Sequence, residues 1–185
     1  MHKYGGIGLL AVAFALVACG GRGGVSSPNA GLTPVGSEMA IEFTLPKKTI
    51  GAELPSEGVG TFTDPTWGKI GGYTQSTLAQ VLAFAPGVTV TFKNLSSSHP
   101  HTLNVVAKVK GPPANFPANP SLPIQAAGGG VLGKGFASGS ISPGGSVKIQ
   151  LKKKGNYLIG CAFHYHEGMQ DVIRVVAHAT PGPTH

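Results

Sequence analysis

Charged residues are scarce in this sequence of 185 residues: they make up 11% of it, and only seven are acidic. Because 41% of the residues are hydrophobic, the chain can bury a core, which excludes a disordered polyelectrolyte. The 29 glycines and 15 prolines exclude a coiled coil or a long-helix protein, whose compositions avoid both residue types. The length suits one ordinary domain and is too short for two substantial ones. The composition therefore predicts a single turn-rich domain that is built from β-strands.

The apolar run near the N-terminus is too short to cross a membrane. It covers residues 7–18 after a basic start at Lys3, whereas a helical span needs about 20 residues. A run of this length after a basic start is typical of a secretory signal peptide. It ends in the tetrapeptide LVAC at Cys19, which resembles a bacterial lipobox, whose cysteine is lipidated and becomes the mature N-terminus. The alternative is an ordinary signal peptide followed by an incidental cysteine.

The lipobox interpretation divides the chain into four parts. Residues 1–18 are the signal peptide, and residues 19–37, dominated by Gly, Ser and Pro, form a flexible tether. Residues 38–178 form the folded domain, and residues 179–185 form a mobile tail. We therefore expect an exported lipoprotein that Cys19 anchors to a membrane of the cell envelope, on the periplasmic or another extracytoplasmic face. Loss of Lys3 with the signal lowers the formal charge from +7 to +6.

Short β-prone runs separated by turn residues fill the domain. In Val88–Lys93 the apolar residues fall at every second position, which is typical of a half-buried strand. Residues 85–87 precede this strand as a hairpin-like break, and residues 111–135, with five Pro and six Gly, form a long irregular insertion. Many short strands punctuated in this way predict a Greek-key sandwich or barrel. The predicted strands are Met39–Leu45, Thr77–Phe84, Val88–Lys93, His101–Val109, Ser146–Leu151, Asn156–Cys161 and Val172–Ala177.

Cys161 is the second unusual cysteine, because it has no disulfide partner if Cys19 carries lipid. One interpretation is a small hydrophobic residue buried at a strand end. The residues that follow favour a functional thiol, since imidazoles and a thioether lie within nine residues of it in the sequence CAFHYHEGM. A further imidazole, that of His101, begins a predicted strand 60 residues earlier.

These donor types point to a particular metal. A thiolate and two imidazoles in a trigonal plane, with a weak Met sulfur on the axis, form a blue-copper electron-transfer site. The soft thiolate and thioether suit Cu(I), and imidazole suits copper in both oxidation states. A closed structural zinc site requires four Cys or His ligands and rarely takes Met. The donor set therefore predicts copper rather than zinc.

The candidate ligands belong to a longer pattern in the sequence. It consists of VTVTFKN at residues 88–94, Pro100-His101, PGGS at residues 143–146, GNY at residues 155–157 and Cys161-x2-His164-x4-Met169. Over residues 76–177 this pattern resembles the plastocyanin-type cupredoxins. The resemblance implies a Greek-key cupredoxin β-sandwich or barrel that holds one copper ion. It also implies that the copper ligands are His101, Cys161, His164 and Met169.

Two of the implied ligands, His164 and Met169, each have one alternative within the ligand loop. His166 stands five residues after Cys161, where azurin-like loops place their histidine, and is the alternative to His164. The plastocyanin spacing favours His164, because the same spacing places Met169 correctly, and it leaves His166 beside the site or in solvent. Glu167 is the alternative to Met169 on the axis.

Other positions depart from the family pattern. Thr102 replaces the Asn that is common after the first histidine ligand, and we expect its hydroxyl to tie the two ligand loops together. Phe163 stands where plastocyanins carry Pro. Gly160 stands where many of them carry an aromatic residue that belongs to a second docking route.

The resemblance places the electron port at the exposed edge of His164. Candidates for an apolar patch around this edge, which alternatively pack in the core, are Pro100, Phe163 and Tyr165. Lys148 and Lys152–Lys154 are either solvated turn residues or a surface that steers an acidic redox partner.

Together these features predict a monomeric type 1 (blue) copper protein, a one-electron carrier between redox proteins such as cytochromes or oxidoreductase complexes. We expect no nucleic-acid partner. The alternative is a copper-binding or copper-delivery protein of the periplasm, which the strand-end Cys161 and its short spacing to His164 disfavour. A copper enzyme such as a nitrite reductase needs further copper centres, which a single remaining cysteine does not supply, so we expect no enzymatic activity.

Overall fold

All regular elements in the described part of the chain are β-strands. The computed structural model describes residues 47–53, 62–73 and 81–183. The predicted signal peptide, the tether with Cys19 and the predicted strand Met39–Leu45 lie outside these residues. Among the described residues, no helix is long and apolar enough to cross a membrane. The strands are β1 (Thr49–Ala52), β2 (Phe62–Asp64), β3 (Gly68–Ile70), β4 (Leu82–Phe84), β5 (Thr89–Asn94), β6 (Asn104–Val109), β7 (Ser146–Gln150), β8 (Gly155–Gly160), β9 (Gln170–Val175) and β10 (Gly182–Pro183).

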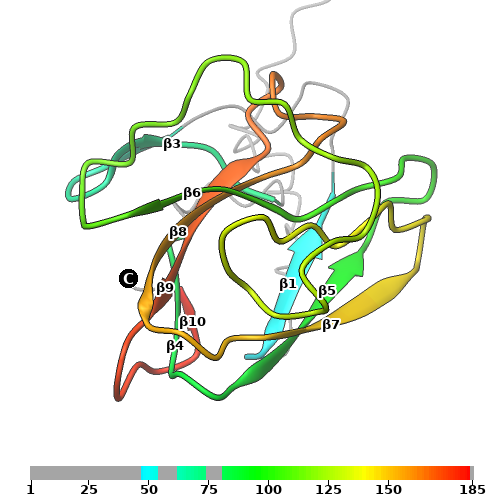
Figure 1. Cartoon of the computed structure of the whole chain (residues 1–185). Coiled ribbons are helices and arrows are strands. Elements are labelled where there is room, and N and C mark those ends of the chain that lie inside the picture. The colour runs from blue at the N-terminus through cyan, green and yellow to red at the C-terminus, as the bar shows by residue number, and fades with distance from the viewer. Residues whose placement is uncertain (1–46, 54–61, 74–80, 184–185) are drawn as a thin grey trace, which may run out of the picture. The chain divides into compact units, whose positions relative to one another are not determined.

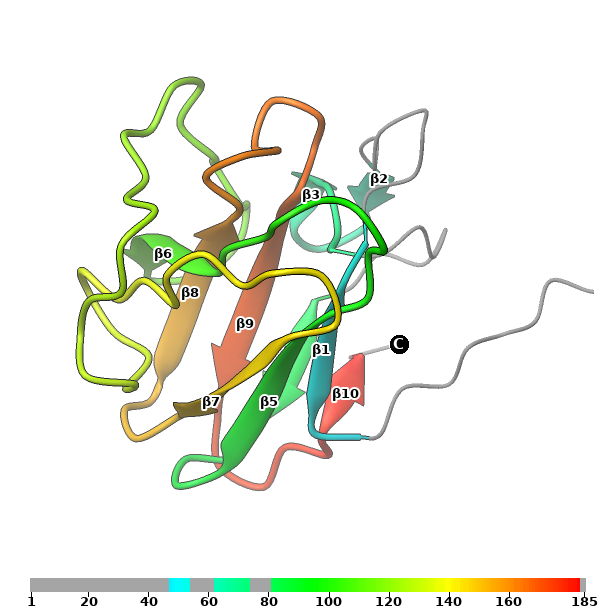
Figure 2. The same ribbon diagram turned by 90° about the vertical axis from the view of Figure 1, so that its right-hand side faces the viewer.

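Two sheets form the two layers of a sandwich (Figures 1 and 2). One sheet has the strand order β1-β5-β7, and the other has the order β10-β4-β9-β8-β6. β1 runs parallel to β5, and β4 runs parallel to β9, whereas the other neighbours within the two sheets are antiparallel. β2 and β3 form a separate antiparallel hairpin. The prediction of an all-β sandwich is confirmed, and the sheets remain open rather than closing into a barrel.

The main core lies between the two sheets. In β5 the side chains of Val90 and Phe92 are fully buried, while those of Thr89 and Lys93 are exposed, so the alternation predicted for this strand is confirmed. These inward side chains belong to the same buried cluster as those of Ile159 and other residues of the larger sheet. Burying large apolar side chains between layers is the main favourable contribution to such a fold.

A second buried cluster covers the outer face of the larger sheet. Leu158 of β8 and Val172 of β9 pack there against Trp67 of the β2–β3 hairpin. Ala114 from the predicted insertion joins this cluster, and its amide donates a hydrogen bond to the Trp67 carbonyl at 2.7 Å. Both faces of the central strands are therefore covered, which explains why every residue in 157–160 is buried.

The insertion predicted at residues 111–135 contains no strand and only isolated bridges. It nevertheless contributes to the fold, because Leu132 is buried in the main core and its amide donates to the Gln150 carbonyl at 2.9 Å. Shortly after it, Phe136 is also buried in that core. The insertion thus closes one side of the sandwich in addition to covering the outer face.

One prediction about a connection is wrong. Residues 85–87 do not join a hairpin, since β4 and β5 belong to different sheets and residues 85–87 carry the chain from one layer to the other. The error arises because strand partners are distant in the sequence. Within the segment predicted as a mobile tail, Gly182 and Pro183 form β10, which pairs with Ala83 and Leu82 of β4. Tail residues 184 and 185 lie outside the described part.

Candidate metal centre

The first candidate ligand, His101, lies just before β6 and is held there by backbone hydrogen bonds. Its amide donates to the Ile141 carbonyl at 3.1 Å, and the Ile141 amide donates back to the His101 carbonyl at 2.8 Å. Asn94, at the end of β5, donates from its side-chain amide to the carbonyls of His99 and Ile141 at 2.8 and 2.9 Å. The buried Asn94 thereby joins the segment before His101 to the segment that pairs with it.

The second group of candidate ligands lies in the loop between β8 and β9. Cys161 follows the last residue of β8, and its amide donates to the Met169 carbonyl at 3.1 Å. The Met169 amide donates to the His164 carbonyl, also at 3.1 Å. Gly168 has a φ of 93°, a conformation that side chains with a Cβ rarely adopt, and it lets the loop turn back to β9. These bonds close residues 161–169 into a compact loop.

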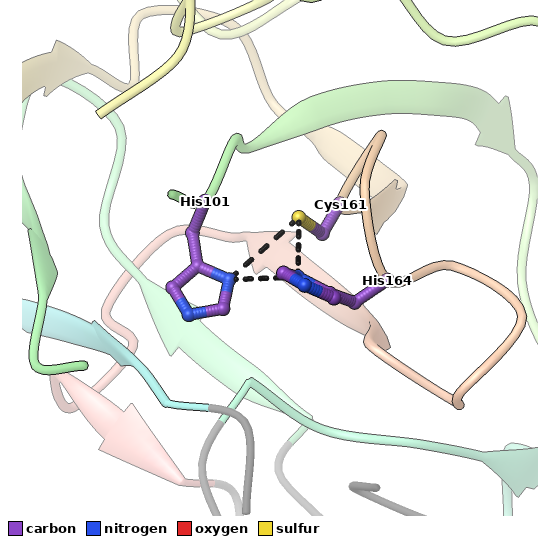
Figure 3. A group of neighbouring side chains, drawn as sticks. All are labelled: His101, Cys161 and His164. Carbon is purple, nitrogen blue, oxygen red and sulfur yellow. Dashed lines mark hydrogen bonds between the residues drawn. The ribbon is translucent and has the colours of Figure 1, made fainter. Parts of the chain in front are cut away.

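The two segments bring three donor atoms together (Figure 3). The Sγ atom of Cys161 lies 3.9 Å from Nδ1 of His101 and 3.7 Å from Nδ1 of His164, and the two Nδ1 atoms are 3.1 Å apart. The point equidistant from these three atoms lies about 2.1 Å from each, close to the ~2.0–2.3 Å of metal–imidazole and metal–thiolate bonds. Among the described residues, His101, Cys161 and His164 form the group of potential ligands that is close enough together to hold a metal ion.

Burial keeps both imidazoles neutral. His101 and Cys161 are fully buried, and His164 is 8% exposed. Desolvation, followed by the proximity of His164 and His99, lowers the pKa of His101 from 6.5 to about 4. Desolvation also lowers the pKa of His164, although the nearby carboxylate of Glu167 opposes this shift. At neutral pH each ring is therefore uncharged and retains a nitrogen lone pair for a metal.

The donor set fits a copper ion. Three Lewis-basic atoms converge at one buried point, and the Nε2 atom of His101 is buried without a hydrogen-bond partner, so Nδ1 makes the ring's polar contacts. Two imidazoles and one thiolate are the donors that hold copper in a trigonal arrangement.

Thr102 ties the two ligand segments together, as predicted from the sequence. Its hydroxyl oxygen accepts hydrogen bonds from the Ala162 amide at 2.8 Å and from the Asn104 side chain at 2.9 Å. The Thr102 amide donates to Cys161 Sγ at 3.3 Å, and its hydroxyl also points to that sulfur at 3.9 Å. Hydrogen bonds to a ligating sulfur fix its orientation and tune the electronic properties of the site.

Gly160 is required by close packing against the ligand loop. A Cβ atom at this position would lie 2.6 Å from the ring of Tyr165, nearer than real Cβ atoms approach their neighbours. Tyr165 is buried, and its hydroxyl donates to the Pro117 carbonyl of the insertion at 2.9 Å. The position where the family pattern often has an aromatic side chain is thus covered by an aromatic ring from the loop itself.

The structure separates His164 from His166. His164 belongs to the donor cluster, whereas His166 is exposed and contacts the ring of Tyr165 edge-on at 6.0 Å between centroids. Glu167 is exposed as well. Met169 is fully buried in the same core cluster as Cys161, and its backbone hydrogen bonds link Cys161 to His164.

The three candidates for an apolar patch beside His164 have different environments. Phe163 is 38% exposed, and its ring centroid lies 6.1 Å from that of His164. Pro100 is partly exposed. Tyr165 is buried and packs in the interior, so it does not contribute to an exposed patch. A contact that the sequence did not indicate is made by the exposed His99, whose ring lies edge-on to that of His164 with centroids 5.8 Å apart.

Known proteins of similar structure include cupredoxins. The reduced auracyanin of the photosynthetic bacterium Roseiflexus castenholzii is 21% identical, with a TM-score of 0.37 over 69% of this chain and 94% of that one. A purple cupredoxin from Nitrosopumilus maritimus is 19% identical, with a TM-score of 0.39 over 69% of this chain and 98% of that one. None of the family models and none of the curated proteins compared with the chain matches it.

A copper-containing nitrite reductase from Thermus scotoductus SA-01 is 18% identical, with a TM-score of 0.34. The match covers 72% of this chain and 29% of the reductase. Because all three similarities are distant, the assignment of a metal site rests on the donor atoms of His101, Cys161 and His164.

Proposed function

We propose that this protein is a type 1 copper protein that carries single electrons between redox partners in the cell envelope. The observation that carries the proposal is the convergence of Cys161 Sγ with Nδ1 of His101 and Nδ1 of His164 at a buried point. A copper ion bound there supplies a one-electron couple between Cu(I) and Cu(II).

The contribution of the chain is a site that is rigid before electron transfer. His101 is fixed by its bridge to Ile141, and Cys161 is fixed at the end of β8 by the bond to Met169. Thr102 holds both segments and donates to the sulfur. Donors held in one arrangement need to move little when the charge at the site changes. By the family resemblance, Met169 would supply a thioether sulfur to the copper ion.

The exposed edge of the site gives electrons a route to a partner. His164 is the one ligand of the trio that reaches the surface, and Phe163 provides an exposed apolar ring beside it. A redox partner that docks over this surface approaches the site through the His164 ring.

The decisive experiment adds Cu(II) to the mature chain and records visible and EPR spectra. We expect an intense thiolate-to-copper absorption band and a narrow copper hyperfine splitting, both absent in Cys161→Ser. A colourless product would refute the proposal. Reversible one-electron voltammetry would then distinguish a carrier from a copper-delivery protein, which should instead transfer its copper readily to a chelator.

The lipid anchor is tested separately. We expect that wild-type protein stays with membranes in high salt, and that Cys19→Ser is released from them by high salt or is not processed. Retention of processed Cys19→Ser in the membrane fraction after a high-salt wash would contradict anchoring through this residue.

A further inference from the structure

Exposed lysines gather at the end of the domain opposite the metal centre. We call this surface the basic end. It consists of three segments: the residues just before β1, the C-terminal end of β6 together with Lys110, and the connection between β7 and β8. All of its lysines are exposed: Lys47, Lys48, Lys108, Lys110, Lys152, Lys153 and Lys154. In Figure 2 the start of β1 and the β7–β8 connection lie at the lower end, whereas the β8–β9 loop with the ligands lies at the upper end.

Hydrogen bonds connect the parts of the basic end. Lys108 Nζ donates to the Lys154 carbonyl at 3.0 Å, and the Asn156 side chain donates to the Lys110 carbonyl at 3.0 Å. The Thr91 amide near the start of β5 donates to the Lys48 carbonyl at 2.8 Å. The lysines therefore lie on one surface, to which both sheets contribute.

Acidic residues among the described positions lie elsewhere. Glu167 and the buried Asp171 belong to the ligand loop and the start of β9, and Glu53 follows β1 at the end that faces away from the lysines. Asp64 lies in the β2–β3 hairpin, where its carboxylate accepts the Trp67 amide. Among the described residues, positive charge is therefore concentrated at the end away from the metal centre.

This separation argues against the lysines as a docking site for an acidic redox partner. Cys161 lies at one end of β8 and Lys154 immediately precedes the other, which places them roughly 20 Å apart at about 3.3 Å per residue. A partner seated on the basic end would be held away from His164 and Phe163, the surface beside the ligands. The basic end therefore suits a partner that positions the domain without exchanging electrons with it.

We propose that the basic end binds the anionic headgroups of the membrane surface, so that the metal centre faces away from the bilayer. This rests on the lipid anchor of the proposed function. Lys47 and Lys48, which precede β1, lie within the basic end, so the chain that leads back to Cys19 leaves the described residues at this surface. Charges act over about 8–10 Å in physiological salt, so a lipid anchor brings the lysines within range of the headgroups and the lysines set the orientation of the domain.

The test uses the mature chain, residues 19–185, with Cys19→Ser, which keeps every described residue and lacks lipid. Its binding is measured by flotation with phosphatidylcholine vesicles and with vesicles that contain phosphatidylglycerol. We expect binding to the anionic vesicles only, and its loss in high salt. Since each lysine near an anionic surface strengthens binding roughly five-fold, Lys152→Gln with Lys153→Gln should weaken it by about 10–30-fold.

A matched double variant separates the surface from net charge. Lys69→Gln with Lys93→Gln removes the same charge from exposed lysines outside the basic end, and we expect less than a three-fold effect. Equal weakening by the two double variants, or no binding to anionic vesicles, would overturn the proposal. Tighter binding of soluble polyglutamate than of vesicles would overturn it in favour of an acidic protein partner.

Orientation is measured with a polarity-sensitive dye on a single introduced cysteine. Because Cys161 is fully buried, Lys153→Cys in the Cys19→Ser chain offers one accessible thiol, and Lys69→Cys is its control. A spectral shift on anionic vesicles is expected at residue 153 and not at residue 69. The reverse pattern would contradict the proposed orientation. These measurements do not depend on copper, so their failure is distinguishable from failure of the copper-site proposal.

Discussion

At one end of β8 Cys161 is fully buried beside two imidazoles that are neutral at pH 7, whereas at the other end Lys152, Lys153 and Lys154 are all exposed. At the buried end, the arrangement of the donors is held by short contacts with neighbouring rings and backbone, which leave little space for a larger side chain. At the exposed end, any function of the lysines depends on charge that is distributed over a surface. The two ends therefore should respond to substitution in different ways, the first in its spectra and stability, the second only in its binding to anionic surfaces.

The largest expected effect concerns the histidine ligands. His164→Gly should bleach or strongly change the blue colour of the copper-loaded protein, because it removes one of the three converging donors. His166→Gly should leave the visible and EPR spectra unchanged, since this ring is exposed outside the cluster. A bleached His166→Gly protein with an unchanged His164→Gly protein would reverse the ligand assignment.

Acid should destabilise the metal-free protein through the buried imidazoles. The folded-state pKa of His101 is about 4, below the ~6.5 of an unfolded chain, so the unfolded state binds protons first as the pH falls. The free energy of unfolding should fall by about 3 kcal/mol between pH 6.5 and 4 from this group and remain constant with respect to it above pH 7. Urea denaturation at several pH values measures the change.

His101→Gln is the variant that should flatten this pH dependence. His178→Gln, at an exposed position, is the control and should retain the wild-type dependence. An unchanged slope in His101→Gln would show that another group causes the acid sensitivity.

Adding a single methyl group beside the ligand loop should also be costly. Gly160→Ala places a Cβ atom against the buried Tyr165 ring, and such overpacking costs about 1–3 kcal/mol. We expect a lower midpoint in thermal denaturation and a shifted copper absorption band. Gly144→Ala is the comparison, because a Cβ atom there meets no neighbour, although its φ of 73° carries its own strain. If Gly160→Ala kept the wild-type spectrum and stability, the packing of Tyr165 would not constrain the loop.

The hydroxyl of Thr102 should matter slightly less. Thr102→Val keeps the shape and leaves the Ala162 amide without its acceptor, at a cost of about 1–2 kcal/mol. It also removes the hydroxyl that points to Cys161 Sγ, so the redox potential from voltammetry should shift. Thr102→Ser should restore both properties in large part. If the Val and Ser variants had equal stability and equal redox potential, the Thr102 hydroxyl would not be the cause of either effect.

The smallest effect is expected at the basic end. Lys152→Gln with Lys153→Gln should change the free energy of unfolding by less than about 0.5 kcal/mol, because both side chains are exposed surface positions. The copper spectrum should be identical to that of wild type. A shifted copper spectrum would mean that the two ends are coupled, contrary to their separation along β8.

Strands with a clear alternation could be predicted, and strands defined by their partners could not. β5 through β9 lie where the sequence places them, to within a few residues, because their alternating or continuous apolar residues face one or two cores. β1 contains Gly51 and alternates weakly, and β2 and β3 have three residues each. These segments adopt the strand conformation because they pair with β5 or with each other. Such pairing depends on residues distant in the sequence and cannot be read from the local pattern.

The sequence by itself determined the donor types, and hence the metal they suit, because softness and charge are properties of the side chains. It also determined that Cys161 and His164 lie in one loop. Only the tertiary structure decided that His164 turns inward while His166 does not, since backbone bonds to Met169 and contacts with Tyr165 shape the loop. It likewise decided that the lysines gather at the end away from the ligands. That segregation depends on strand order and direction, which join residues such as Lys48, Lys108 and Lys154 that are distant in the chain.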